Sequence, residues 1–164
     1  MNGQKKLYEV LQNLNIAFDY YEHPPAPTIE IAKKYWIDIE ATHCKNLFFR
    51  NHKGNRHYLV IFDCNYDLNI HNLEKRLRQG KLSFASDQRM EKYLGIKAGS
   101  ISPFGLINDT EKHVYVFIDE NLRLAEKISF HPNINTASLV IKFSDFIKFI
   151  NWTGNSYEFI KTSG

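Results

Sequence analysis

The spacing of hydrophobic and polar residues divides the chain into helices and strands. Leu7, Val10, Leu11 and Leu14 recur at helical spacing, so the pattern predicts an amphipathic helix over residues 4–15. Capping Ser and Thr residues and helix-ending glycines indicate the other helices. These are predicted from Thr28 along to Trp36, around Leu73 and Leu77 up to Gly80, from Ser86 to Gly95, and over residues 145–152 after a Ser144 cap.

Strands are predicted where apolar residues run together or alternate with polar ones. Residues 45–51 and 56–63 are apolar and are separated by the hairpin-type turn of residues 51–55. Residues 113–119 are also predicted as a strand. Residues 136–143 are predicted as another, because their side chains alternate between an apolar face and a more polar one. Phe18–Glu22 is short and extended. The prolines that follow in residues 23–27 exclude a helix there, because each fixes φ.

The order of these elements favours one α+β domain that spans residues 1–164. Helices and strands interleave without a regular βαβ repeat, which indicates a mixed, mostly antiparallel sheet with flanking helices. We find no internal repeat and no linker.

Composition narrows the function classes. With 43% hydrophobic and 24% charged residues, the sequence is typical of globular proteins. No apolar run approaches the roughly 18 residues of a membrane helix, and residues 1–6 lead into a mixed polar segment without the apolar stretch of a signal peptide. We therefore expect a cytoplasmic protein without a membrane partner. The net charge of +3 permits an RNA partner.

The two cysteines, Cys44 and Cys64, are expected to be free thiols. No Cys or His spacing suits zinc, so we expect no metal site and no cofactor.

Three irregular segments are candidates for a functional site. In the first, Lys45 and Asn46 open an otherwise apolar strand, a common place for functional side chains. In the second, residues 99–109, two glycines and two serines offer backbone N–H groups that can cradle an anion or a carbonyl oxygen. In the third, the proline after His131 forces this histidine into an extended conformation. Each segment also has a purely structural alternative. The first could be a solvated strand end, the second an ordinary loop, and the third a histidine that bonds to nearby backbone groups.

Taken together, these segments resemble a known family. Lys45-Asn46-Leu47-Phe48, the 99–109 loop and His131-Pro132-x-x-Asn135-Thr136 are similar to motifs of the aminoacyl-tRNA editing family, which includes the YbaK proteins and the insertion domain of bacterial prolyl-tRNA synthetase. Four further segments match the family in the same order along the sequence: Glu22-His23-Pro24-Pro25, Leu82-Ser83-Phe84-Ala85, Leu94-Gly95 and Asn108-Asp109. Within the family, the sequence most resembles the trans-editing alanyl-tRNA(Pro) deacylases (ProXp-ala or PrdX).

The resemblance implies a barrel-like editing fold and hydrolysis of the ester between alanine and tRNA(Pro), without a metal or a protein nucleophile. It also implies that Lys45 is important for activity. We expect Lys45 and Asn46 to be the catalytic residues, with Lys45 binding polar atoms of the aminoacyl-adenosine end and Asn46 helping to orient the aminoacyl group. We expect His131 to line the aminoacyl pocket. Backbone amides of the Gly99–Gly105 loop would contact the ester carbonyl and the ribose. The predicted substrate-binding residues are Gly99, Ser100, Ser102, Pro103, Phe104, Gly105, Asn108, His131 and Asn135.

Basic residues are the candidates for contacts with the tRNA acceptor end. They form two groups, one around the hairpin and one on and after the third helix: Arg50, Lys53 and Arg56, then Arg76 and Lys81. A solvated charged face is the alternative for each of them. Prolyl-tRNA synthetase and an elongation factor are further partners to consider.

Three other functions stay open at this stage. A deacylase for Cys-tRNA(Pro), Ser-tRNA or Thr-tRNA would share the scaffold. A module that only binds aminoacyl-tRNA or an amino acid would need no catalytic residue. A thiol hydrolase would use Cys44, whose pKa an adjacent lysine could lower, together with His43 or His131.

Overall fold

Eight strands pair into one mixed sheet in the order β1-β7-β6-β2-β3-β5-β8, with β4 beside β2. The computed structural model describes residues 1–162. The strands are β1 (Asp19–Glu22), β2 (Thr42–Arg50), β3 (His57–Asp63), β4 (Ser83–Phe84), β5 (Tyr115–Asp119), β6 (Lys127–Phe130), β7 (Ala137–Lys142) and β8 (Tyr157–Ile160).

The sheet mixes both strand directions. Four neighbouring pairs are antiparallel, and three pairs (β2·β6, β3·β5 and β5·β8) are parallel. The predicted α+β class and mixed sheet are therefore confirmed. The sheet does not close into a complete barrel, because β1 and β8 lie at opposite ends of the order and do not pair with each other within residues 1–162.

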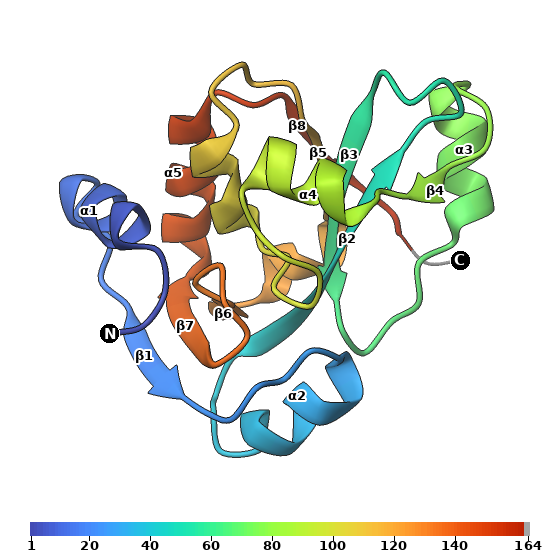
Figure 1. Cartoon of the computed structure of the whole chain (residues 1–164). Helices are drawn as coiled ribbons and strands as arrows, with labels where there is room; N and C mark the ends of the chain where they lie inside the picture. The colour runs from blue at the N-terminus through green and yellow to red at the C-terminus, as the bar shows by residue number, and fades with distance from the viewer. Residues whose placement is uncertain (163–164) are drawn as a thin grey trace.

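Helices cover both faces of the sheet (Figure 1). They are α1 (Lys5–Asn13), α2 (Ile29–Trp36), α3 (Ile70–Leu77), α4 (Asp87–Leu94) and α5 (Phe143–Thr153), with short 3-10 helices η1 (Pro103–Asn108) and η2 (Glu120–Leu124). Thr28 and Ser86 cap α2 and α4 as expected, since their hydroxyl oxygens accept backbone N–H groups. Ser144 does not cap α5, because that helix already begins at Phe143.

The apolar side chains form three clusters. The largest lies between one face of the sheet and α1, α4 and α5, and it includes Leu7, Leu94 and Phe149. A second cluster lies between the opposite face and α3. A third, small cluster lies under α2, where Trp36 and Ala32 pack near Val140 of β7. Helix α2 is thus held by few apolar contacts compared with the rest of the fold.

Two differences from the sequence-based expectation matter for the site. Strand β2 begins at Thr42 rather than at residue 45, because Thr42 and His43 pair with β6, a strand that was not predicted. Lys45 is therefore the fourth residue of the strand and does not open it. The second candidate segment contains η1 instead of being loop throughout. Within the described residues, no helix is long and apolar enough to cross a membrane.

Candidate active site

A cavity of about 320 Å³ lies between helix α2, strand β2 and two loops. Four separate parts of the sequence meet around it, in residues 26–36, 44–47, 99–101 and 129–138. The volume is at the lower end of the range for ligand pockets, so the cavity suits a small group. Three of the four parts coincide with the candidate segments of the sequence.

The cavity opens where the sheet splits. One edge of β2 pairs with β3 over most of its length. On the other edge, β6 pairs with Thr42 and His43, and β4 pairs with Phe49 and Arg50. Residues 44–48 lie between these two contacts and have no paired strand on this edge within the described residues. The split therefore leaves a stretch of backbone at the cavity.

The hydrogen-bond pattern shows which backbone groups face this open edge. In an antiparallel pair, alternate residues direct both backbone groups at the partner strand. The Asn51 N–H donates to the Arg56 carbonyl, so the odd-numbered residues of β2 face β3. Phe48 faces the other way, since its carbonyl accepts the Ala85 N–H. By the same alternation, the backbone N–H and carbonyl of Asn46 point into the gap.

Lys45 and Asn46 approach the cavity from opposite faces of β2, because successive side chains of a strand alternate. The Lys45 side chain is exposed, and its ammonium group has no hydrogen bond or ion pair with any residue in 1–162. The Asn46 side-chain oxygen is buried and has no hydrogen-bond donor among the described residues. A buried acceptor without a partner costs free energy, so a ligand that donates a hydrogen bond to the Asn46 oxygen would be favoured. The Lys45 ammonium group can likewise donate hydrogen bonds to a ligand.

His131 reaches the cavity from the loop after β6. Its Nδ1–H donates to the Ala137 carbonyl at 2.8 Å, which leaves Nε2 as a hydrogen-bond acceptor. Burial lowers the pKa of His131, and the nearby His23 and His43 lower it further. The ring is therefore neutral at neutral pH and can accept a hydrogen bond but cannot supply a positive charge.

Two polar residues at the cavity were not singled out from the sequence. Ser138 lines the cavity, and its hydroxyl donates to Nε2 of His23 at 3.0 Å, while His23 donates from Nδ1 to the Pro24 carbonyl. The rings of His23 and His131 lie 5.9 Å apart. Ser129, buried on β6, also lines the cavity. The alternating pattern of β7 predicts that Ser138 lies on the face opposite Ala137 and Leu139. It does not indicate that Ser138 belongs to a functional site.

Trp36 was predicted only as an apolar position of a helix, but it forms part of the cavity wall. Its indole Nε1–H is buried without an acceptor. Nothing in a single sequence separates a core tryptophan from one that lines a cavity, so no signal was available for this residue.

The glycine-containing segment contributes less to the cavity than expected. Of its predicted site residues, only Gly99 lines the cavity, together with Ile101. The Ser100 N–H donates to the Lys97 carbonyl, and the Phe104 N–H donates to the Ser102 hydroxyl. These amides are therefore already paired. From Ser102 onward the residues turn into η1 and lie in the core: Ser102, Pro103, Phe104 and Gly105.

Asn108 and Asn135 support the scaffold around the cavity. The Asn108 amide donates to the Leu94 carbonyl and to Gln4, which ties η1 to α4 and to the N-terminus. The Asn135 carbonyl accepts the Ala26 N–H, which holds the proline-containing segment beside the cavity. Neither side chain lines the cavity, so the structure does not bring these two residues together with Lys45.

A comparison with protein families decides the identity. The model of the aminoacyl-tRNA editing domain matches residues 23–149, which include every residue that lines the cavity. The protein belongs to this family. As an aminoacyl-tRNA editing domain it is a deacylase, an enzyme that hydrolyses the ester between an amino acid and tRNA.

Relatives match over nearly the whole editing domain. The sequence is 37% identical over 163 residues to the "Prolyl-tRNA editing protein ProX" of Acetoanaerobium sticklandii, covering 98% of both proteins. It is 30% identical to "Prolyl-tRNA synthetase associated domain-containing protein 1" of Danio rerio, covering 92% of this sequence and 82% of that one. A solved structure of a proposed trans-editing enzyme for prolyl tRNA synthetase shares the fold, with a TM-score of 0.71, 16% identity and coverage of 99% of both proteins.

The thiol of Cys44 in this editing domain is not activated, contrary to one of the open functions. Cys44 is buried, and burial raises its pKa well above the ordinary value, with Asp63 as the next cause. His43 lies next to it in β2, so the two side chains point to opposite faces. The expectation that Lys45 lowers the pKa of Cys44 is therefore wrong, since Lys45 also points to the other face.

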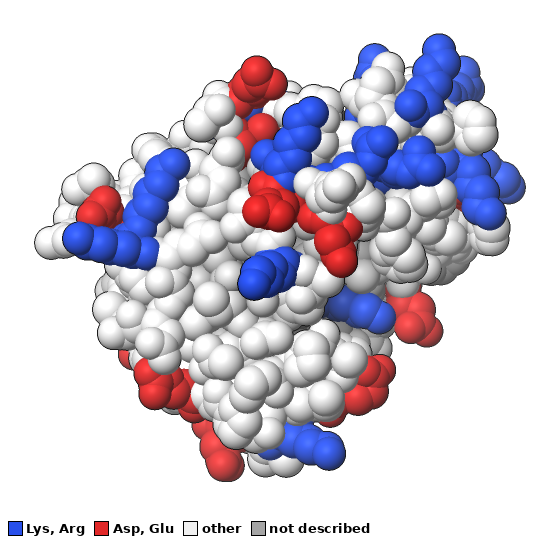
Figure 2. Space-filling model, viewed as in Figure 1, with Lys and Arg blue, Asp and Glu red and all other residues white. Residues whose placement is uncertain are grey.

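The basic residues predicted to contact tRNA lie toward one end of the molecule. Figure 2 shows Lys and Arg side chains gathered over α3 and the β2–β3 hairpin. The two groups adjoin, because the His52 N–H at the hairpin donates to the Gln79 carbonyl after α3. Arg76 is paired with Glu158 at 2.5 Å, so its charge is already compensated. Arg50, Lys53, Arg56 and Lys81 form no ion pair within residues 1–162.

Proposed function

We propose that the protein acts in trans to remove alanine from mischarged tRNA(Pro). One observation carries this proposal: Lys45, Asn46, Gly99 and His131 come from three separate segments and line the same cavity of about 320 Å³. The names of the relatives refer to prolyl-tRNA editing and to prolyl-tRNA synthetase, which supports tRNA(Pro) as the carrier. The motifs that resemble alanyl-tRNA(Pro) deacylases support alanine as the amino acid.

The polar groups of the cavity suit the two ends of an aminoacyl ester. The exposed Lys45 ammonium is placed to donate charge-assisted hydrogen bonds to oxygens of the terminal adenosine and the ester. The unpaired side-chain oxygen of Asn46 and its backbone carbonyl oxygen suit the α-ammonium group of the amino acid. The Asn46 N–H suits the ester carbonyl oxygen, so one residue would orient both ends of the aminoacyl group.

The reaction needs only modest catalysis, because an aminoacyl ester is already activated. A water molecule, oriented with help from the ribose 2′-OH, adds to the ester carbonyl, and the bond between this carbon and the ribose oxygen breaks. The negative charge that develops on the carbonyl oxygen is stabilised by fixed donors, for which Lys45 and the Asn46 N–H are the candidates. Alanine and deacylated tRNA are released.

A small cavity explains why editing would spare proline. A synthetase pocket built for proline cannot strongly exclude alanine, which is smaller. A second site can instead exclude by size. Ala26, Ala32 and His131 line the cavity, and the His131 ring is bonded to the Ala137 carbonyl, so we assign the aminoacyl group to the space that these residues bound. Proline is bulkier than alanine and its amine is secondary, so it would fit this space less well.

The acceptor end of tRNA is the partner that this reaction requires. Phosphate contacts at the basic end of the molecule would make binding weaken as salt rises. Prolyl-tRNA synthetase and an elongation factor, which handle the same tRNA, are the proteins to examine as docking partners.

A deacylation time course tests the proposal. The purified protein is mixed separately with Ala-tRNA(Pro), Pro-tRNA(Pro), Cys-tRNA(Pro) and Ala-tRNA(Ala). We expect rapid loss of alanine from tRNA(Pro), strongly slowed in Lys45→Ala. Lys127→Ala removes an exposed lysine from β6, away from the cavity, and serves as the matched control.

The other outcomes separate the remaining functions. Loss of cysteine, serine or threonine from tRNA would keep the family and replace the substrate. Equal turnover in Lys45→Ala would remove this lysine from the mechanism. Binding of aminoacyl-tRNA without hydrolysis of any substrate would indicate a sensing module and overturn the proposal.

A further inference from the structure

Two arginines from distant parts of the sequence meet at the turn of the β2–β3 hairpin. Arg50 is the last residue of β2, and Arg89 lies in the first turn of α4. The position that a Cβ atom would occupy on Gly54 is 2.9 Å from Nη2 of Arg89 and 3.3 Å from Nη1 of Arg50. The two guanidinium groups therefore lie within roughly 6 Å of each other, where like charges repel.

Within residues 1–162, no carboxylate forms an ion pair with either arginine. The ion pairs within residues 1–162 are His71–Glu74 and Arg76–Glu158. The one hydrogen bond that the Arg50 side chain makes within residues 1–162 is to the His52 carbonyl, at 3.4 Å. Arg89 also lies near the positive end of the α4 helix dipole, which disfavours a cation there. An anion between the two groups would relieve all of these repulsions.

A series of hydrogen bonds fixes Arg89 in this unfavourable place. Its Nη1 donates to the Gly54 carbonyl at 2.7 Å and to Nε2 of His57 at 2.9 Å. His57 then donates from Nδ1 to Nε2 of His113 at 2.8 Å. The Tyr93 ring packs on both imidazoles, with centroids 4.2 Å and 4.4 Å away. The guanidinium is thus pre-organised, and its Nη2 has no hydrogen bond within the described residues.

His57 can play this part because it is neutral. It is 1% exposed, and burial lowers its pKa to about 4, with His113 and Arg89 as further causes. A protonated His57 could not accept the bond from Arg89. The buried histidine therefore serves to hold the arginine.

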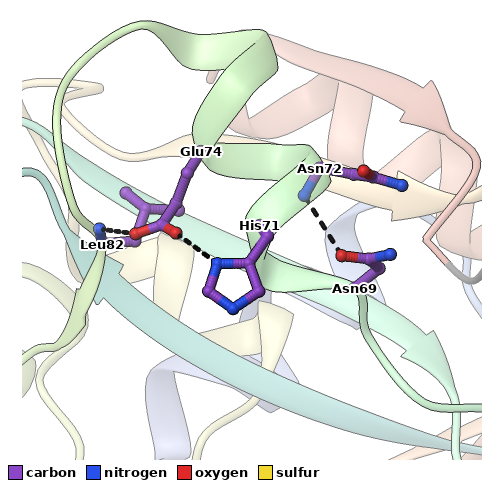
Figure 3. A network of polar contacts seen from close by, with 5 residues as sticks. All are labelled: Asn69, His71, Asn72, Glu74 and Leu82. Carbon is purple, nitrogen blue, oxygen red and sulfur yellow. Dashed lines mark hydrogen bonds and ion pairs between the residues drawn. The ribbon is translucent and has the colours of Figure 1, made fainter.

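The neighbouring helix α3 is anchored so that its basic end stays beside the hairpin. Figure 3 shows the Asn69 side chain accepting the Asn72 N–H at the start of α3, and Glu74 accepting the Leu82 N–H. The segment between Glu74 and Leu82 contains Gln79, which contacts the hairpin through the His52 N–H and the Asn51 side chain. These bonds connect the basic residues of α3 to the hairpin that carries Arg50.

We propose that Arg50 and Arg89 form a binding site for a backbone phosphate of RNA. Guanidinium groups bind phosphate through paired N–H donors, and two of them can hold one phosphate from two sides. Because this ligand belongs to a tRNA, the inference rests on the proposed function. Arg50 follows Lys45 by five positions along the same strand, a distance of about 17 Å in extended backbone. RNA whose 3′ end enters the cavity would pass this site some nucleotides upstream.

Equilibrium binding of a deacylated RNA hairpin tests the site without any catalysis. The hairpin copies a tRNA acceptor stem with its single-stranded 3′ end, and its affinity is measured at several salt concentrations. For Arg50→Gln and for Arg89→Gln we expect weaker binding and a salt slope reduced by about one each. Arg123→Gln removes the same charge from η2, far along the sequence, and should leave the slope unchanged.

One unfolding measurement and one further variant guard against a folding effect. Arg50→Gln leaves the hydrogen bonds from Arg89 to His57 and from His57 to His113 intact, so its thermal unfolding should match the wild type while its binding weakens. Arg89→Lys keeps one charge but loses the planar pair of donors, and should bind with intermediate affinity. Salt slopes of Arg50→Gln and Arg89→Gln equal to that of the wild type, or an equal reduction in Arg123→Gln, would overturn the proposal.

Inorganic phosphate is the second probe, because a small phosphorylated molecule would offer the same chemistry. Phosphate binding that both glutamine variants lose, with unchanged RNA binding, would assign the site to such a molecule and overturn the RNA assignment. Failure of the proposed deacylase function would give a different result from failure of this phosphate site. The wild type would then hydrolyse no aminoacyl-tRNA, whereas binding of deacylated RNA through Arg50 and Arg89 would still be measured.

Discussion

Trp36 of α2 and His43 of β2 stack face to face beside the cavity, with ring centroids 4.3 Å apart and planes at 5°. His43 is held in turn by a hydrogen bond from Nε2 to the Ile39 carbonyl, and burial lowers its pKa, so the ring stays neutral. Few other apolar contacts hold α2 on the sheet. The stack therefore links the helix that covers the cavity to the strand that carries Lys45.

Replacement of Trp36 should destabilise both the fold and the site. Trp36 is 9% exposed, so Trp36→Ala should lower the free energy of unfolding by about 3–5 kcal/mol. Trp152 of α5 is 46% exposed, and Trp152→Ala should cost roughly 1 kcal/mol or less. Urea unfolding measures both values. Equal costs for the two variants would show that the stack does not hold α2.

Gly99 lies against Pro27, and this contact sets the distance between two walls of the cavity. A Cβ on Gly99 would lie 3.1 Å from both Cα and the carbonyl oxygen of Pro27, and the φ of Gly99 is +84°. Gly154 has a similar φ of +76°, but a Cβ there would meet only the Lys112 side chain, at 3.6 Å. Alanine substitutions at Gly99 and Gly154 can therefore be compared to separate the cost of backbone strain from the cost of steric contact.

We expect Gly154→Ala to cost about 1 kcal/mol, the penalty for an L residue at positive φ. Gly99→Ala should cost more, because the residue 26–28 segment must also move, and it should reduce deacylation even where the protein stays folded. Unfolding curves and initial rates measure the two effects. If both variants lost the same stability and kept full activity, the contact with Pro27 would have no role in the site.

The cavity could be predicted in part because its residues carry unusual local patterns. Lys45 and Asn46 stand out as polar residues in an apolar strand, and His131 stands out by the proline after it. The same motifs also contain residues that have a structural role and do not line the cavity. Ser102 caps η1, and Asp109 accepts the N–H groups of His113 and Val114 in the core. A motif in one sequence does not separate these two kinds of residue.

Other parts of the site depend on tertiary pairing and were not predictable. The gap beside Asn46 exists because β6 and β4 contact different ends of β2, and β4 has only two residues. Strands β6 and β8 contain Ile, Phe and Tyr, which favour strands, but each has only four residues, too few for a clear pattern in the sequence alone. Arg89 and Arg50 are 39 positions apart, and only the folded hairpin brings them together.

The buried His57 should make stability depend on pH. Its pKa is about 4 in the folded protein and about 6.5 when unfolded, so the unfolded state binds a proton first as the pH falls. The stabilisation is complete above pH ~6.5 and is lost as the pH falls toward ~4, by on the order of 2–3 kcal/mol. Unfolding by urea at a series of pH values measures this loss.

His57→Gln should be less stable than the wild type at pH 7 but less sensitive to pH between ~6.5 and ~4. His71→Gln is the control, because that side chain is 84% exposed on α3. Equal pH sensitivity of His57→Gln and the wild type would mean that His57 titrates normally in the folded protein, and would also remove the neutral acceptor on which Arg89 depends.

The buried thiol of Cys44 should not take part in catalysis. Its raised pKa leaves little thiolate at neutral pH, and the thiolate is the nucleophilic form. We therefore expect Cys44→Ser to hydrolyse the substrate at a rate within a few-fold of the wild type. Alkylation of the native protein should leave Cys44 unmodified. Loss of activity in Cys44→Ser with an unchanged unfolding curve would restore the thiol hydrolase as a hypothesis.

His131 should determine which amino acids the cavity accepts. Its ring is fixed by the bond from Nδ1 to the Ala137 carbonyl, so the cavity cannot widen by rotation of this side chain. His131→Ala removes that wall. A difference of one methylene in an apolar pocket discriminates by about 10–200-fold, so the preference for alanine over serine, cysteine and proline should fall by about tenfold or more.

The ratio of kcat/KM for two aminoacyl-tRNAs is the right measure of this effect. Both substrates meet the same folded fraction of the variant, so any loss of stability cancels in the ratio. His71→Ala, which removes an exposed imidazole from α3, should leave the ratio at its wild-type value. A ratio that also stays constant in His131→Ala would show that His131 only satisfies the Ala137 carbonyl. Selection would then rest with apolar side chains that line the cavity, such as Ala26 and Ala32.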